Sequence, residues 1–331
     1  MCAKRKLINK IVQNIIVIAK KEYTDSIKSK LFLVLLIFLL ALTIISIAVA
    51  SFDFQNKIIE YNKSVQILEN LGKSADLISA PQFFPLKMLR GVMDYLEIIG
   101  AIIGIILGYM SIAKEKGKNT LQLLLSRPIR RFEIGIGKIL GNSWVVLLTL
   151  GATLAATYFI MWFFGGAQLT LVEMEKLSLV FAASYLYVMF FFGLTSILAV
   201  KFQSLPNALI ISFVIWLGIV LIIPQIGDTM DPDNQIPGGF FKTMHITKPQ
   251  EKQIMAGFSN YETVRNATEE SSVTKHYERL SFALLGIKDE YNGKSIQDIF
   301  RDKWLDGFWV LMFFLASIAM ELFIFEKKFD N

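Results

Sequence analysis

The chain has few of the residues from which soluble catalytic and metal sites are usually built. It contains one cysteine, Cys2, and two histidines, His245 and His276, among 331 residues. A single cysteine excludes an intrachain disulfide and a cysteine-based metal site. Aspartates cluster at 228–233, but their spacing to the histidines is not that of zinc or copper ligands. We therefore expect a solvated turn, two surface histidines and no metal site.

A phosphate-binding loop is also lacking. The nearest match is the segment GIGK at 135–138. It lacks the glycine that should stand five residues before its second glycine, and Ile139 occupies the position of the magnesium-binding Ser or Thr. We therefore expect no ATPase site and no cofactor in this chain. An activity driven by ATP would need a second polypeptide to bind the nucleotide.

Long apolar runs, in contrast, are abundant. Hydrophobic residues make up 54% of the chain, and 27 residues are Phe. Runs near 20 residues match the thickness of a bilayer when helical. The pattern predicts an all-α membrane protein with six transmembrane helices. The predicted spans are 31–51, 93–113, 139–163, 177–200, 206–226 and 307–325.

The distribution of Lys and Arg indicates the orientation. Residues 1–30 carry eight basic and two acidic side chains, and residues 114–138 carry seven basic and two acidic ones. Basic residues are enriched in short cytoplasmic segments. We therefore expect both termini and the 114–138 loop to be cytoplasmic in a multi-pass protein of the plasma membrane. The net charge of +6 then reflects topology and not nucleic-acid binding.

The N-terminal segment, residues 1–30, has apolar residues at helical spacing. This pattern predicts an amphipathic helix lying at the cytoplasmic membrane interface. A signal peptide is the competing interpretation, because 48–50 resembles a cleavage site. The basic region and the apolar run are both too long for one. The apolar residues are Leu7, Ile8, Ile11, Val12, Ile15 and Ile16.

Two longer segments are expected outside the cell. Residues 52–92 suggest a helix broken by Pro81 and Pro85. Residues 227–306 predict a large extracytoplasmic loop with helical segments, which forms a cap. The chain thus divides into the interfacial helix at 1–30, five spans at 31–226, the cap, and the last span with a short tail at 307–331.

The basic loop at 114–138 contains a short amphipathic helix. Asn119 and Gln122 form a capping-box pattern, and three leucines share one face of the turns that follow. The residue before Pro128 leaves the helical region, so the helix should end there. Such a helix can dock into a groove on a partner protein, or lie in the headgroup layer. The spacing alone favours neither.

This loop resembles that of ABC-2 type ABC transporter permeases, although Asn119 stands where the family usually has Gly. The resemblance implies a coupling element that sits on a separate ATPase subunit, and a dimer with a second permease copy. The overall layout is most similar to permeases linked to multi-copper enzyme maturation. The residues assigned to the loop by the resemblance are Glu115, Thr120, Leu121, Leu124, Leu125, Arg127, Pro128, Arg130, Arg131, Gly137 and Lys138.

Two further patterns lie within the spans. Small residues at Gly100, Gly104 and Gly108 permit close helix packing. We favour contact within one chain over contact between two copies. Glu97 and Glu321 are intramembrane acidic candidates for a functional site. Snorkelling anchors near the two membrane surfaces are the favoured interpretation for both.

The sequence therefore predicts a permease subunit of an ABC transporter, an exporter, with membrane lipids as further partners and no nucleic acid. One alternative is a non-transporting membrane subunit that acts on or assembles extracytoplasmic proteins. The other is a membrane-embedded lipid transferase. Such an enzyme needs clustered carboxylates or histidines at a membrane face, and the cytoplasmic loops have no such cluster.

Overall fold

The computed structural model of this protein describes residues 2–71, 84–117, 129–165, 169–231, 236 and 239–328. Within those ranges every regular element is a helix. Six helical stretches are long and apolar enough to cross a membrane, which confirms the all-α, six-span fold. They are Lys30–Asn70, Pro85–Lys116, Arg131–Phe163, Leu171–Lys201, Leu205–Met230 and Ile296–Lys327.

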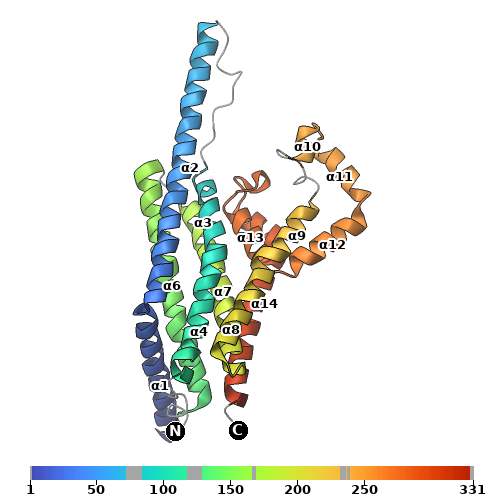
Figure 1. Ribbon diagram of the computed structural model, residues 1–331. Helices are drawn as coiled ribbons and strands as arrows, with labels where there is room; N and C mark the ends of the chain where they lie inside the picture. The colour runs from blue at the N-terminus through green and yellow to red at the C-terminus, as the bar shows by residue number, and fades with distance from the viewer. Residues whose placement is uncertain are drawn as a thin grey trace.

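The first span is the most extended element (Figure 1). Helix α2, Lys30–Asn70, has 41 residues and continues well past the predicted end at residue 51. At 1.5 Å per residue it is about 60 Å long, roughly twice the bilayer core. No Pro or Gly interrupts it. The expected helix break at Pro81 lies outside the described residues, and Pro85 starts the short 3₁₀ turn η2, Pro85–Leu89.

The second span forms the core with the fourth. It comprises α3 (Arg90–Tyr95), the π-helical turn η3 (Leu96–Gly100) and α4 (Ala101–Gly117). Helix α7, Leu171–Lys201, packs closely along α4. These two spans are the most enclosed of the six.

Three glycines account for this close packing. A Cβ atom at Gly104 would lie 2.4 Å from the carbonyl oxygen of Val188, and one at Gly108 would lie 2.4 Å from that of Phe192. A Cβ at Gly100 would meet the Val188 side chain at 3.2 Å. The structure therefore places the small-residue ridge of α4 against the backbone of α7 in the same chain.

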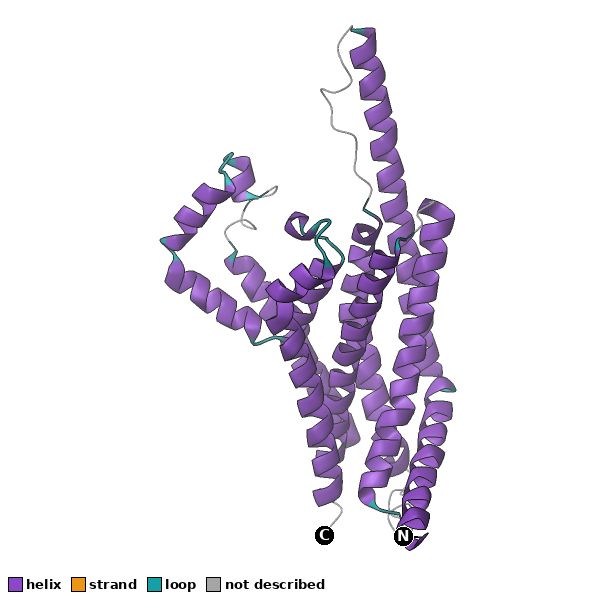
Figure 2. Ribbon diagram, turned by 180° about the vertical axis from the view of Figure 1, so that it is seen from behind, coloured by secondary structure: helices purple, strands orange, loops and turns teal. Residues whose placement is uncertain are grey.

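The remaining spans surround this pair, as the view from behind shows (Figure 2). Helix α1 (Cys2–Ile27) lies against α6 (Arg131–Gly165), which also contacts α2. The fifth span joins α8 (Leu205–Trp216), the π-helical turn η4 (Leu217–Ile222) and α9 (Ile223–Met230). Helix α14, Ile296–Lys328, packs on α7.

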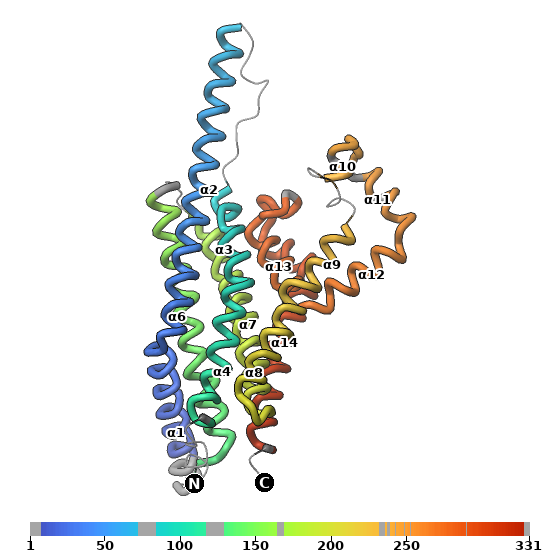
Figure 3. The backbone as a smooth tube through the Cα atoms, in the orientation of Figure 1, coloured from blue at the N-terminus to red at the C-terminus, as the bar shows by residue number. Residues whose placement is uncertain are grey.

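Short helices follow the fifth span (Figure 3). They are α10 (Phe240–Thr243), α11 (Lys248–Ala256), α12 (Ser259–Glu270), α13 (Val273–Leu284) and the 3₁₀ turn η6 (Asp289–Tyr291). Among them, α10, α11 and α12 form an arm beside the bundle. Helix α13 is almost wholly buried against α7 and α14. This part of the 227–306 segment is thus packed into the bundle.

The burial of α13 corrects the expectation of two surface histidines. His245 is exposed, but His276 on α13 is only 2% exposed. Its Nδ1 lies 2.8 Å from Asp306 Oδ1, and its Nε2 lies 3.0 Å from the carbonyl oxygen of Glu270. The expectation failed because the groups that satisfy the buried ring come from α14 and from the end of α12, and the residues next to His276 in sequence do not report them.

Candidate functional site

Helix α1 approaches α6 at the end of the bundle where α1 begins and α14 ends, called here the inner end (Figure 1). Two glycines of α6 permit the contact. A Cβ at Gly137 would lie 2.7 Å from the Ile18 side chain, and one at Gly141 would lie 2.5 Å from the carbonyl oxygen of Ala19. The backbones of α1 and α6 are therefore nearly in contact, as small residues permit.

Four charged side chains meet beside this contact, and they are called here the charged junction: Lys21 and Glu22 from α1, Glu115 from α4, and Lys138 from α6. Lys138 is 0% exposed. Its Nζ lies 3.0 Å from both Glu22 Oε1 and Glu115 Oε2, and donates to the carbonyl of Ser111 at 2.6 Å. The ammonium thus donates two hydrogen bonds, to Glu22 and Ser111, and forms an ion pair with Glu115.

Lys21 completes the charged junction from its exposed side. Its Nζ donates to Glu115 Oε1 at 2.8 Å and lies 3.7 Å from Glu22 Oε1. Partial burial opposes the charged form of Lys21. The hydrogen bond to Glu115 and the negative charges of Glu115, Glu22 and Asp25 outweigh that effect, so the pKa of Lys21 is raised. The ammonium therefore stays charged at any physiological pH.

The charges of the junction balance, with two lysines against two glutamates. Glu22 and Glu115 are 4% and 5% exposed, so neither carboxylate is well hydrated. Removing one partner of a buried ion pair costs about 3–5 kcal/mol, because the other charge stays buried without compensation. The junction therefore fixes α1, α4 and α6 relative to one another.

Further polar contacts extend this attachment along α1 and α6. Asn14 donates to Glu133 Oε2 at 2.8 Å, and Ser26 donates to Asn142 Oδ1 at 2.9 Å. The first pair lies near the start of α6 and the second lies beyond Lys138. Helix α1 is thus attached to α6 on both sides of the charged junction.

Two basic residues of the predicted coupling loop bind the ends of other spans. Arg131 Nη1 donates to the carbonyl of Glu326 on α14 at 3.5 Å. A cation at a helix C-terminus stabilises the unpaired carbonyls there. The Nζ of Lys116 does the same at the end of α7, where it donates to the carbonyls of Ala199, Val200 and Phe202.

The structure brings together two of the residues assigned to the loop, Glu115 and Lys138. Arg130 is exposed, and Arg131 is half-buried. The other loop residues lie outside the described part of the chain, and with them the amphipathic helix that they were expected to form. These are Thr120, Leu121, Leu124, Leu125, Arg127 and Pro128.

The two intramembrane acids have different surroundings. Glu97 is half-buried in the π-helical turn η3. Glu321 is 0% exposed, and Ser196 Oγ on α7 donates to its Oε1 at 2.5 Å. The interpretation of Glu321 as a snorkelling anchor is therefore wrong. Its position near the end of the span suggested access to the interface, but α7 covers the side chain.

Glu22 and Lys21 were not singled out from the sequence, where they counted only toward the charge of the N-terminal segment. One signal was present. Glu22 falls on the same helical face as Ile15 and Ile18, at i+7 and i+4. An acid on the apolar face of an amphipathic helix indicates a buried partner, but the identity of that partner depends on the tertiary fold.

The charged junction has the arrangement of a structural joint. The buried ammonium of Lys138 is held by a carboxylate and a carbonyl oxygen. No nucleophile with an adjacent base is present among the residues of the junction. Among the residues that the structure describes, no group of three or more His, Cys, Asp or Glu is placed to hold a metal ion.

Comparison with known families supports a transport subunit. The family described as ABC-2 family transporter protein matches residues 16–328, nearly the whole chain. A search of curated proteins gives no match. The matched region includes all six spans and the charged junction. The chain therefore belongs to the ABC-2 transporter family and is a multi-pass membrane permease subunit of an ABC transporter.

Proposed function

We propose that this permease serves an exporter and is driven by a separate ATPase subunit that docks at the inner end, on the loop at residues 114–138. Both termini and this loop then face the cytoplasm, in a protein of the plasma membrane. Closure of the ATPase pushes on the loop, and the charged junction transmits the displacement to α1, α4 and α6. The spans rearrange, and a path opens along the subunit interface.

The observation that carries this proposal is the position of the charged junction. Glu115 lies in the last turn of α4, and Lys138 lies near the start of α6. These helices enter and leave the loop. Lys138 pairs with Glu22 of α1 and Glu115 of α4, and Lys21 of α1 pairs with Glu115, so a force on the loop reaches three helices together. A loop held only by its two flanking helices would not move α1.

The proposed assembly contains two permease copies and two ATPase subunits. The family implies an ABC ATPase partner. The chain has no phosphate-binding loop of its own, so the ATPase must supply the nucleotide site. A second permease copy would complete the transport path across a shared interface, and the resemblance implies the export direction.

The test is co-purification of the permease with its ATPase from membranes. Leu124 and Leu125 are expected to fill an apolar groove on the ATPase, where burial of one Leu contributes about 1.5–3 kcal/mol. The double variant Leu124→Asp/Leu125→Asp should therefore insert normally and lose the ATPase. The matched control is Ile254→Asp/Phe258→Asp, which adds the same charges at exposed apolar residues of the arm.

The control variant should retain its ATPase at full stoichiometry. If the Leu variant inserts and also retains the ATPase at full stoichiometry, the loop is not the docking element. Residues 118–128 would then be assigned to the headgroup layer.

A further inference from the structure

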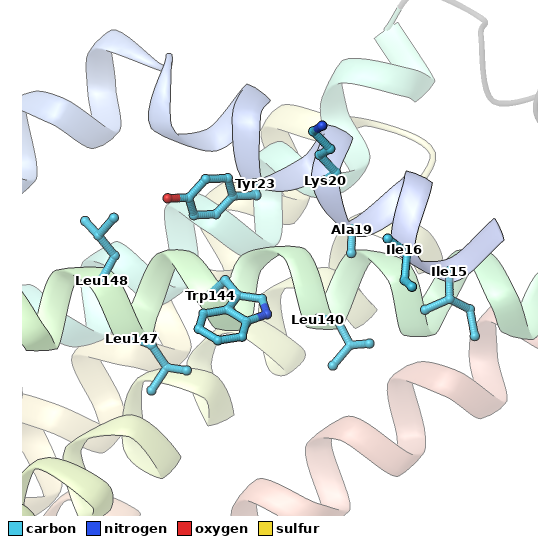
Figure 4. A pocket seen from close by; sticks show the side chains of 9 residues that line it. All are labelled: Ile15, Ile16, Ala19, Lys20, Tyr23, Leu140, Trp144, Leu147 and Leu148. Carbon is cyan, nitrogen blue, oxygen red and sulfur yellow. The ribbon is translucent and has the colours of Figure 1, made fainter. Parts of the chain in front are cut away.

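An apolar groove runs between α1 and α6 (Figure 4), with a volume of about 690 Å³. Its wall is aliphatic and aromatic except for one charged side chain, Lys20 of α1. The groove lies beside the close contact of α1 with α6 at Gly137 and Gly141. The lining residues are Ile15, Ile16, Ala19, Lys20, Tyr23, Leu140, Trp144, Leu147 and Leu148.

The groove lies at the level where the apolar part of α6 begins. The basic and polar start of α6 ends near Asn142, and the groove extends from Leu140 to Leu148. Trp144 lies midway along this stretch and is 64% exposed. Tyr23 lies across from Trp144 on α1 (Figure 4). Trp and Tyr concentrate where the acyl chains of a bilayer meet the headgroups.

Lys20 differs from the neighbouring lysine. Lys21 points into the charged junction and binds Glu115. Lys20 is exposed on the α1 side of the groove (Figure 4). Within the described ranges, its ammonium has neither an ion pair nor a hydrogen bond. A lysine beside an apolar surface keeps its charge in the headgroup layer while its stem covers apolar atoms.

We propose that this groove is a binding site for one anionic phospholipid of the adjacent leaflet. The lipid phosphate pairs with Lys20, and an acyl chain lies along Leu140, Leu147 and Leu148. The groove has one positive charge, on Lys20, and is otherwise apolar, so it matches a lipid with a negative headgroup and acyl chains. The lipid fills the seam between α1 and α6. This inference does not depend on the ATPase docking site.

The test uses the full chain in nanodiscs of phosphatidylcholine with a minority of phosphatidylglycerol. Native mass spectrometry then counts the phosphatidylglycerol that stays bound. Lys20→Gln removes the charge and keeps the length of the side chain. The matched control is Lys28→Gln, because Lys28 is also an exposed lysine near the end of α1 and does not line the groove.

The wild type and the Lys28→Gln control should retain phosphatidylglycerol in preference to phosphatidylcholine. In Lys20→Gln the preference for phosphatidylglycerol should fall about five-fold. This factor corresponds to roughly 1 kcal/mol for one basic residue near a membrane surface. If Lys20→Gln and Lys28→Gln lost equal amounts of bound phosphatidylglycerol, the lipid would be held by general electrostatic attraction, and the proposed site would be wrong. Unchanged binding in Lys20→Gln would overturn it as well.

A second measurement distinguishes a lipid from a second copy of the chain. Ile16→Cys, in a Cys2→Ser background, places one thiol in the groove. Low reactivity between copies is expected when a lipid occupies the groove. Efficient disulfide formation between two copies at this position would assign the groove to a permease interface and overturn the lipid proposal.

Discussion

The inner end and the outer half of the bundle are held together by different chemistry. At the inner end, the charged junction joins α1, α4 and α6 through ion pairs to the fully buried Lys138. In the outer half, Tyr187 of α7 stacks on Tyr277 of α13, with ring centroids 4.5 Å apart and an angle of 14° between the planes. Only the inner cluster is made of charged side chains.

The hydroxyl groups of the outer pair are neutral and paired. Tyr187 donates to the carbonyl of Glu97 at 2.9 Å, and the Tyr277 hydroxyl lies 2.8 Å from Ser184 Oγ. Burial raises the pKa of Tyr277. The two clusters therefore differ in what their loss would cost. A neutral hydrogen bond contributes modestly to the free energy of unfolding, whereas a buried charge without a partner destabilises the fold by several kcal/mol.

The largest expected effect is at Lys138. Lys138→Met leaves Glu22 and Glu115 buried without their main partner, and should lower the free energy of unfolding by about 3–5 kcal/mol. Thermal unfolding of the detergent-solubilised protein measures the loss. The control Lys28→Met, at an exposed lysine, should leave the midpoint unchanged.

Adding Glu22→Gln and Glu115→Gln to the Lys138→Met variant should restore part of the stability, because neutral amides cost less to bury than unpaired carboxylates. A loss below about 1 kcal/mol in Lys138→Met alone would give the junction the strength of an exposed ion pair. The distinction between the two ends of the bundle would then fail.

The next effect concerns two glycines of the same helix, α6. A Cβ at Gly141 would lie 2.5 Å from the carbonyl oxygen of Ala19, whereas one at Gly151 meets nothing within 4 Å. Gly141→Ala should destabilise by about 1–3 kcal/mol through overpacking. Gly151→Ala should be neutral or stabilise by up to about 1 kcal/mol, as helix propensity dictates. If both substitutions shifted the unfolding midpoint in the same direction, α1 would not be tightly packed on α6.

The smallest effect is expected at the outer pair. Tyr277→Phe removes one neutral hydroxyl and keeps the stacked ring, so the free energy of unfolding should fall by about 0.5–1.5 kcal/mol. Ser184 keeps its bond to the carbonyl of Val180. The loss should not depend on salt concentration. Tyr261→Phe, at an exposed tyrosine of the arm, serves as the control and should change nothing.

The spans could be predicted from the sequence because hydropathy over bilayer length is a local property. The true end of α2 could not, since hydropathy marks the apolar part of a helix and not where the helix stops. Residues 52–70 are polar enough to look like a loop, but they contain no residue that ends a helix.

The candidate site could be predicted only in part. Glu115 and Lys138 were assigned through the resemblance, and the structure places them in contact. Lys138 pairs with Glu22, 116 positions away, and Glu115 pairs with Lys21, 94 positions away. No sequence spacing reports such contacts. Glu321 shows the same limit, because its burial depends on α7 and not on its neighbours in the chain.

The length of α2 has a mechanical consequence. The helix is separated from α1 by two residues, starts at the end of α1 far from the N-terminus (Figure 1), and runs unbroken to Asn70. A rod of about 60 Å that tilts by about 10° at its base moves its tip by about 10 Å. Small rotations of α1 would thus become large excursions outside the membrane. Helix α2 would thus act as a lever that amplifies, at Asn70, a small movement at Lys30.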